Sequence, residues 1–138
     1  MLETTTYIDT RYPECDRAGI IHHAVYPIWY EMARMEFFEK MGFSFTDMDK
    51  LGVNPVVVDL HLQYKAMATY PQRVRITTRI GQYGARKLEL VYACYAEDRD
   101  EPINTATSFH VWTGPDMKTY NLEENLPEVY AKVAAAAE

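Results

Sequence analysis

The sequence predicts an α+β fold in which an antiparallel β-sheet wraps around one long helix. Three observations support this prediction. Apolar residues recur with a helical period over residues 26–41, apolar and polar residues alternate in later segments, and hairpin-length connections join those segments. One long amphipathic helix needs a sheet face against which its apolar side is buried, so the fold class is α+β.

The composition indicates a single domain spanning residues 1–138. The chain has a mass of 16.0 kDa, with 48% hydrophobic and 25% charged residues, which is ordinary for a protein with one core. A formal net charge of -6 and a pI near 5.2 argue against a nucleic-acid surface, which needs clustered Lys and Arg. Two cysteines are too few for a disulfide framework, and no Cys-x-x-Cys pair indicates a structural zinc site.

The amino-terminal segment MLETTTYIDTRY has neither the basic nor the apolar region of a secretion signal. No later window approaches the roughly 18 uninterrupted apolar residues that a membrane span needs. We therefore expect a cytoplasmic protein with reduced thiols.

The first expected elements are a strand at residues 4–13, which are β-branched and aromatic, and the long helix. Pro27 fits the first helical turn, and Gly42 fits a left-handed stop. Met35 and Phe38 widen the apolar side, so we expect the helix to be covered on more than one side. The main apolar stripe consists of Tyr26, Trp29, Tyr30, Ala33, Phe37 and Met41.

A short helix and four strands are expected next. Ser44 and Asp47 have capping-box spacing, and Gly52 ends the short helix. Strict alternation then predicts half-buried strands at residues 56–65 and in the segments up to 113. In the first of these, one face is expected to carry Val56, Val58, Leu60, Leu62 and Tyr64. The alanine-rich end, about residues 128–138, is expected to be helical or frayed.

The segment CDRAGIIHHAVY carries the candidate chemistry. An isolated aspartate before a glycine, such as Asp16, more often forms an Asx turn than a catalytic group. The catalytic alternative places the Asp16 carboxylate opposite unpaired backbone N–H groups at the start of the helix, around His23 to Tyr26, which are fixed donors for an oxyanion. Gly19 would let the backbone fold back so that the acid and the helix start share one cavity.

The adjacent histidines do not indicate a metal site. Consecutive side chains on a strand or turn point apart, and His61 and His110 are distant in sequence, so we expect no bound metal. The bland interpretation makes one of His22 and His23 buried and the other exposed. In the functional interpretation His23 contacts a carbonyl through its side chain or its backbone N–H; we favour the N–H because it does not depend on protonation.

Other candidate residues have common structural explanations. Cys15 is more often a core residue than a nucleophile, and the eleven tyrosines suit a core or an interface, although they can also line an acyl pocket. Arg86 and Lys87 are ordinarily solvated turn charges; alternatively they hold phosphates at a pocket mouth. The sequence contains no Gly-x-Ser-x-Gly elbow, phosphate-binding glycine loop or His-Glu-x-x-His motif.

The segment RYPECDRAGIIHHAVYPIWYEMAR, residues 11–34, resembles the signature of hotdog-fold acyl-CoA thioesterases of the 4-hydroxybenzoyl-CoA thioesterase class. The resemblance extends more weakly, through the order of elements, over residues 1–112. It implies a hotdog fold, with a long central helix wrapped by a five-stranded antiparallel β-sheet. It also implies that Asp16 is the catalytic carboxylate, as nucleophile or general base, and that the His23 N–H binds the thioester carbonyl.

The same resemblance implies the substrate contacts. Gly19 and His22 would lie beside the substrate, Tyr26 and Glu31 match the helical part of the signature, and Glu31 would face the ligand. Arg34 also matches and is expected to pack or orient neighbouring groups. The chain departs from the family pattern at Val25 and in YPQRV at residues 70–74.

Arg86 and Lys87 look similar to cations that bind the nucleotide phosphates of coenzyme A in this family. Family members form their sites between two subunits, so a homodimer or a dimer of dimers is expected. Coenzyme A would be part of the substrate, and no separate cofactor is expected.

We therefore expect an acyl-CoA thioesterase for a small aryl or aliphatic acyl group. Three alternatives stay open at this point: a thioesterase acting on acyl carrier protein, a hotdog hydroxyacyl dehydratase, and an acyl-CoA-binding protein without catalysis. The dehydratase would need a histidine and an acid across the substrate's α and β carbons, and no such pair is evident.

Overall fold

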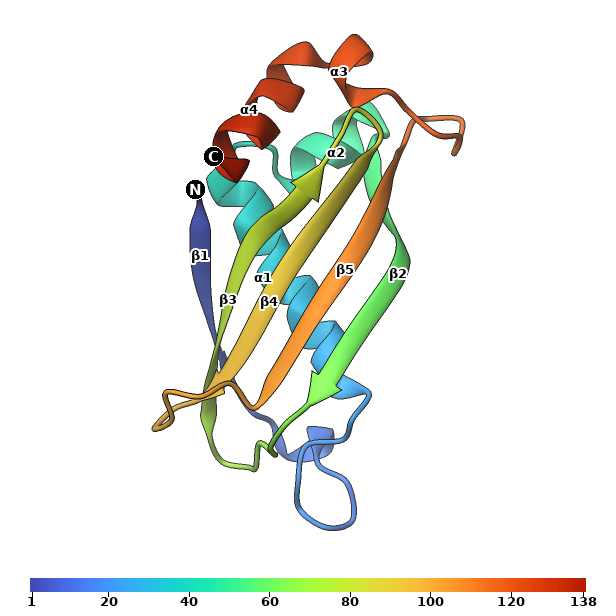
Figure 1. Cartoon of the computed structure of the whole chain (residues 1–138). Helices are drawn as coiled ribbons and strands as arrows, with labels where there is room; N and C mark the ends of the chain where they lie inside the picture. The colour runs from blue at the N-terminus through green and yellow to red at the C-terminus, as the bar shows by residue number, and fades with distance from the viewer.

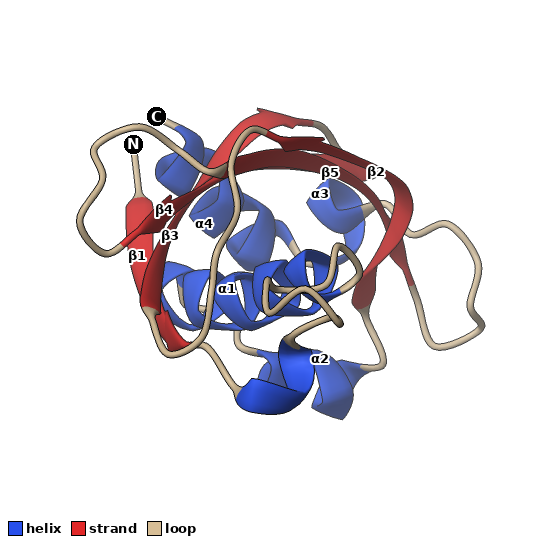
Figure 2. Ribbon diagram, turned by 90° about the horizontal axis from the view of Figure 1, so that it is seen from below, coloured by secondary structure: helices blue, strands red, loops and turns tan.

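The computed structural model describes residues 1–138 and contains one five-stranded sheet that arches over a long helix, α1 (Figures 1 and 2). All neighbouring strands are antiparallel, in the order β1-β3-β4-β5-β2. This confirms the predicted α+β class and the wrapped helix. The strands are β1 (Glu3–Asp9), β2 (Asn54–Tyr64), β3 (Arg73–Tyr83), β4 (Lys87–Ala96) and β5 (Asn104–Thr113), and the helices are α1 (Val25–Met41), α2 (Phe45–Leu51), α3 (Leu122–Asn125) and α4 (Pro127–Ala137).

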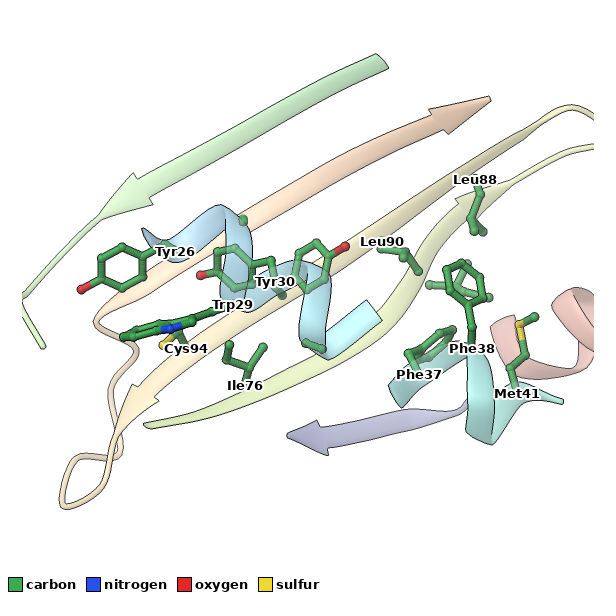
Figure 3. Close-up of a cluster of buried hydrophobic side chains, with 14 of the residues drawn as sticks. Tyr26, Trp29, Tyr30, Phe37, Phe38, Met41, Ile76, Leu88, Leu90 and Cys94 are labelled. Carbon is green, nitrogen blue, oxygen red and sulfur yellow. The ribbon is translucent and has the colours of Figure 1, made fainter. Parts of the chain in front are cut away.

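Helix α1 forms the centre of the core because its apolar stripe faces the sheet. Every residue of the predicted stripe is buried, and Figure 3 shows part of the cluster that this stripe forms with strand residues such as Ile76 and Leu90. Gly42 ends the helix with a left-handed φ of 100°. Phe38 is buried as expected, but Met35 is 47% exposed, because the sheet covers only one side of α1.

The remaining helices lie together at one end of the sheet, where α1 ends (Figure 1). Ser44 and Asp47 bond reciprocally at the start of α2, and Gly52 ends it with a φ of 66°, as predicted. Helix α4 occupies most of the alanine-rich end, and the Lys132 ammonium donates to the Gly42 carbonyl oxygen at 2.9 Å. This bond ties α4 to the end of α1. No helix is long and apolar enough to cross a membrane.

The first strand is shorter than predicted. It ends at Asp9, and Tyr12–Glu14 form a 3-10 turn in its place. Pro13 fixes its own φ and lacks an N–H for a strand ladder. The Glu14 carboxylate also accepts the Arg11 N–H at 2.7 Å, which stabilises the turn.

Strand β2 differs most from its prediction. A register shift between Val57 and Asp59 places Val57 opposite the inward His110, so strict alternation from Val56 is wrong. On the inner side, which faces α1, β2 presents Pro55, Val57, Leu60, Leu62 and Tyr64. The predicted half-burial is also wrong for the single chain, because β2 is an edge strand that α1 leaves largely uncovered.

Candidate active site

A tight hairpin connects Asp16 to the start of α1. The Asp16 N–H donates to the Ile20 carbonyl at 2.8 Å, and the His22 N–H donates to the Glu14 carbonyl at 2.8 Å. Gly19 closes the tip with a φ of 82°, donating to the Asp16 carbonyl at 3.1 Å. Two residue pairs along such a ladder span about 7 Å, so the backbones of Asp16 and His22 are held at that order of separation.

The Asp16 side chain lies at the surface of the single chain. Its Oδ1 accepts the Ala18 N–H at 2.8 Å, which is the Asx turn of the bland interpretation, and this bond leaves Oδ2 without a partner. The adjoining cavity, about 310 Å³, is lined by Tyr12, Pro13, Cys15, Asp16, Arg17, Gly19 and Tyr70. It does not reach the start of α1. Within one chain, the expected shared cavity of acid and helix start is therefore not enclosed.

In the turn that leads into α1, residues 22–25, one backbone amide is unpaired. The His22 N–H is used by the hairpin, the Ala24 N–H donates to Nδ1 of His22 at 3.0 Å, and the Val25 N–H donates to the His22 carbonyl at 3.0 Å. The His23 N–H has no acceptor in the chain. Among these four consecutive amides, His23 alone offers a free donor for a substrate carbonyl.

The peptide after this amide is fixed from both sides. The Tyr64 hydroxyl donates to the His23 carbonyl at 2.7 Å, while the Ala24 N–H is held by His22. The two histidine rings stack at 4.2 Å between centroids, and both residues are exposed. The expectation that the side chains point apart is wrong, and so is the alternative interpretation in which one of them is buried, because residues 22–24 form a turn into the helix rather than a strand.

A buried acid that the sequence analysis missed anchors the hairpin. Glu14 is 8% exposed, and its Oε2 accepts the Trp29 indole N–H at 3.0 Å. The Arg11 guanidinium lies 3.6 Å from the same oxygen. The three-residue spacing of Arg11 and Glu14 could have indicated the cap of the 3-10 turn from the sequence alone. The contact between Glu14 and Trp29 spans the hairpin, so no local pattern indicates it.

The helical residues of the signature separate into two groups. Tyr26 is buried, its hydroxyl accepts the Ala68 N–H at 3.3 Å, and burial raises its pKa, so it supports the core. Glu31 is exposed and lines a second cavity together with Arg34, between α1, α2 and β2. Of these helical residues, only Glu31 and Arg34 face a cavity.

Arg86 and Lys87 lie far from Asp16 in the same chain. Both are exposed at the turn between β3 and β4, whereas the loop between β1 and α1, which carries Asp16, lies beyond the other end of the sheet (Figure 1). A strand of the length of β4 spans about 30 Å. One chain therefore does not bring these cations to its own Asp16.

The structure offers no competing nucleophile or metal centre. Burial raises the pKa of the Cys94 thiol to about 12, and Cys15 is half-buried without a bonded base. No group of three or more His, Cys, Asp or Glu side chains is arranged to hold a metal ion.

The model of a family described as the thioesterase-like superfamily matches residues 10–134. The chain belongs to this superfamily. The matched range includes the hairpin and α1.

Individual relatives agree with the family. The "Putative acyl-CoA thioesterase YneP" of Bacillus subtilis (strain 168) is 36% identical over 104 residues, 75% of each chain. A solved structure of DHNA-CoA thioesterase from Staphylococcus aureus is 33% identical with a TM-score of 0.89, covering 98% of this chain and 93% of the other. A 1,4-dihydroxy-2-naphthoyl-CoA thioesterase from Synechocystis, 16% identical and covering 96% of each chain, shares the fold with a TM-score of 0.82. The predicted hotdog fold is confirmed.

Proposed function

We propose that this protein hydrolyses acyl-CoA with the Asp16 carboxylate and the His23 N–H acting on one thioester carbonyl. Membership of the superfamily makes the chain a thioester hydrolase. The single observation that supports this site best is the free His23 N–H, which the hairpin holds near Asp16. Hydrolysis, rather than binding alone or dehydration, follows from the family and from the pairing of a carboxylate with one fixed donor.

The chemistry needs only these two groups and water. The carbonyl oxygen accepts the His23 N–H, which stabilises the negative charge that develops on it. In one route Asp16 attacks the carbonyl carbon, the coenzyme A thiolate leaves, and water hydrolyses the resulting anhydride. In the other, Asp16 accepts a proton from the water that attacks the carbonyl carbon, and the coenzyme A thiolate leaves. An oxyanion donor contributes a factor of about 10² to 10³, and a general base about 10² to 10⁴.

A homodimer would complete the site. Strand β2 is a long edge strand with unpaired backbone groups and exposed apolar residues, including Val58 at 60% and Leu60 at 37%. Antiparallel pairing of two β2 strands about a twofold axis would join the two sheets and cover this edge. It would also bring one subunit's β3–β4 turn toward the other subunit's Asp16. A dimer of dimers is the larger alternative.

In this assembly Arg86 and Lys87 of one subunit bind the phosphates of the coenzyme A that enters the other subunit's site. An acidic protein needs such local cations to hold an anionic ligand, because its net charge of -6 repels it. Gly19 and His22 border the carbonyl, and Glu31 lies further along α1. We expect the protein to act in the cytoplasm without a resident cofactor or metal, on acyl-CoA rather than acyl carrier protein.

The replacement Asp16→Asn tests this proposal. It keeps the side chain's size and an oxygen that accepts the Ala18 N–H but removes the carboxylate. We expect thiol release from a panel of aryl, short-chain and long-chain acyl-CoAs to fall by about 10² or more. Binding of a coenzyme A thioether, measured by calorimetry, should persist.

Asp116→Asn is the matched control. Asp116 is exposed and accepts the Lys118 N–H at 3.0 Å in the same type of turn, but it lies after β5. This variant should hydrolyse the panel at the wild-type rate. Unchanged hydrolysis by Asp16→Asn would refute the role given to Asp16, and a monomer in sedimentation at assay concentration would refute the shared site.

A further inference from the structure

The second cavity contains a half-buried cation without a carboxylate partner. It has a volume of about 360 Å³ and lies between α1, α2 and β2. Arg34 on α1 lines it, and no Asp or Glu oxygen lies within 4.0 Å of the guanidinium. Its one hydrogen bond runs from Nη1 to the Tyr92 hydroxyl at 3.1 Å. A guanidinium has five N–H donors, so most of the donors of Arg34 remain available.

A chain of buried hydrogen bonds continues from Tyr92 across the sheet. The Tyr92 and Ser108 hydroxyl oxygens are 2.7 Å apart, Ser108 lies 2.7 Å from Nε2 of His110, and Nδ1 of His110 lies 2.9 Å from the Pro55 carbonyl oxygen. Pro55 lines the same cavity as Arg34. The chain of bonds therefore starts and ends at residues that line the same cavity.

The direction of every bond in this chain is determined. Arg34 only donates and the Pro55 carbonyl only accepts, while burial lowers the pKa of His110 to about 4 and keeps the ring neutral. Nδ1 of His110 then carries the proton, Ser108 donates to Nε2, and Tyr92 donates to Ser108. The Tyr92 oxygen is left to accept from Arg34, so this one bond orients the guanidinium.

An apolar track leads from the His23 amide to this cavity. The inward residues of β2 run from Tyr64, which bonds the His23 carbonyl, through Leu62 and Leu60 to Val57, which lines the cavity. Leu60 is 37% exposed. Pairing of β2 through its backbone would leave these side chains free to line a groove for an acyl chain.

The distance along this track limits the ligand. Residues 23 and 34 are separated by about 16 Å along a helix axis, and the Arg34 side chain leans back toward the helix start. That distance exceeds one aromatic ring and suits an extended medium-length acyl chain.

Glu31 and Asp49 also line the cavity and supply acceptors. A neutral hydroxyl can accept from Arg34 and donate to an acid, whereas a carboxylate would be repelled by both acids.

We propose that Arg34, positioned by Tyr92, Ser108 and His110, selects acyl groups of medium length that carry a hydroxyl at the far end. This inference rests on the proposed thioesterase function and names its substrate class. Arg34 contacts the substrate's hydroxyl, and the other three residues act through Arg34.

The test compares three substrates of equal chain length: octanoyl-CoA, ω-hydroxyoctanoyl-CoA and suberoyl-CoA, which ends in a carboxylate. We expect the wild type to prefer the hydroxylated chain over octanoyl-CoA at least tenfold in kcat/KM. Arg34→Met should reduce this preference to below twofold while octanoyl-CoA is still hydrolysed. Arg34→Lys should restore part of the preference, because it returns a cation.

Arg79→Met is the matched control, since Arg79 is a half-buried arginine on the outer face of the sheet. It should keep the wild-type preference. Tyr92→Phe keeps the ring in the core and should weaken the preference several-fold, mainly through KM, which provides a second test if Arg34→Met does not fold.

Three outcomes would overturn the inference: equal rates on octanoyl and ω-hydroxyoctanoyl chains in the wild type, faster hydrolysis of suberoyl-CoA, or an undiminished preference in Arg34→Met. Absence of thiol release from all three substrates and from the wider panel would instead refute the proposed function.

Discussion

The two flanks of α1 are built differently. On one flank β1 and β3 pack against the helix, and their inward residues, such as Ile8, Val74 and Ile76, are buried. On the other flank the inner face of β2 stays open, with Leu60 and Tyr64 exposed at 37% and 51%. Figure 2 shows the sheet curving from β1 on one side of α1 to β2 on the other.

This difference separates stability from function. The closed flank buries a continuous apolar cluster, which is the main source of folding free energy. The open flank carries the unpaired groups on which the proposed site depends: the His23 N–H, the remaining Arg34 donors and the β2 edge. Groups that a chain leaves unsatisfied are available to a substrate or to a second subunit, and the following predictions test that division.

The largest effect on stability is expected at Phe37, which is fully buried. Phe37→Ala should lower the free energy of unfolding by about 3 to 5 kcal/mol, because it removes apolar contacts and leaves a cavity. Met35→Ala, on the exposed side of α1, should cost less than about 1 kcal/mol. Urea unfolding measures both. Similar losses for the two variants would contradict the assignment of the core.

The next prediction concerns His110 on β5, which donates to the Pro55 carbonyl of the neighbouring strand β2. Burial lowers its pKa from 6.5 to about 4, so between these pH values the unfolded chain binds a proton that the folded chain does not. The contribution of neutral His110 to the free energy of unfolding is therefore present above pH 6.5 and is lost as the pH falls toward 4. It amounts to about 3 kcal/mol.

Unfolding titrations from pH 7 to pH 4 should show this loss in the wild type. His110→Gln, which can still donate to Pro55, should lose about 3 kcal/mol less over the same range. Parallel pH curves for the two proteins would show that His110 is not buried in neutral form.

The phosphate cations should affect binding rather than chemistry. Replacing Arg86 and Lys87 together by Gln should raise KM for acyl-CoA about tenfold at low ionic strength, with kcat little changed. The difference should shrink in high salt. Lys50→Gln, an exposed cation on α2, is the control. A lower kcat at unchanged KM would contradict the phosphate role.

The smallest predicted effect tests the fixed peptide on the open flank. Tyr64→Phe removes the hydroxyl that donates to the His23 carbonyl, and one such bond is worth about 1 kcal/mol. We expect kcat to fall about fivefold with KM nearly constant. Tyr7→Phe, an exposed tyrosine on β1, should leave both constants unchanged. Equal effects of the two variants would contradict the positioning role of Tyr64.

The closed flank was largely predictable from sequence because its signals are local. The helical period of α1, the stop at Gly42 and the Ser44 cap each depend on neighbouring residues, and each was predicted correctly. The strand alternation of β3 and β4 was also correct, because both strands are covered by α1 on one face.

The open flank was predicted poorly for the opposite reason. The bulge in β2 and its exposure depend on which strand lies beside it and on where α1 ends its cover. Contacts such as Tyr64 with His23 join residues that are distant in sequence, so no local pattern indicates them. The resemblance pointed to Asp16 and His23, but only the folded structure shows that the His23 N–H is unpaired.

The most direct test of the account is the His23 amide itself. A coenzyme A analogue with methylene in place of the thioester sulfur keeps the carbonyl but resists hydrolysis. In a ¹H–¹⁵N spectrum, its binding should shift the His23 N–H downfield and slow its exchange, while the Ala24 N–H, already bonded to His22, changes less. If the analogue binds and the His23 N–H keeps its free chemical shift and exchange rate, the central claim is contradicted.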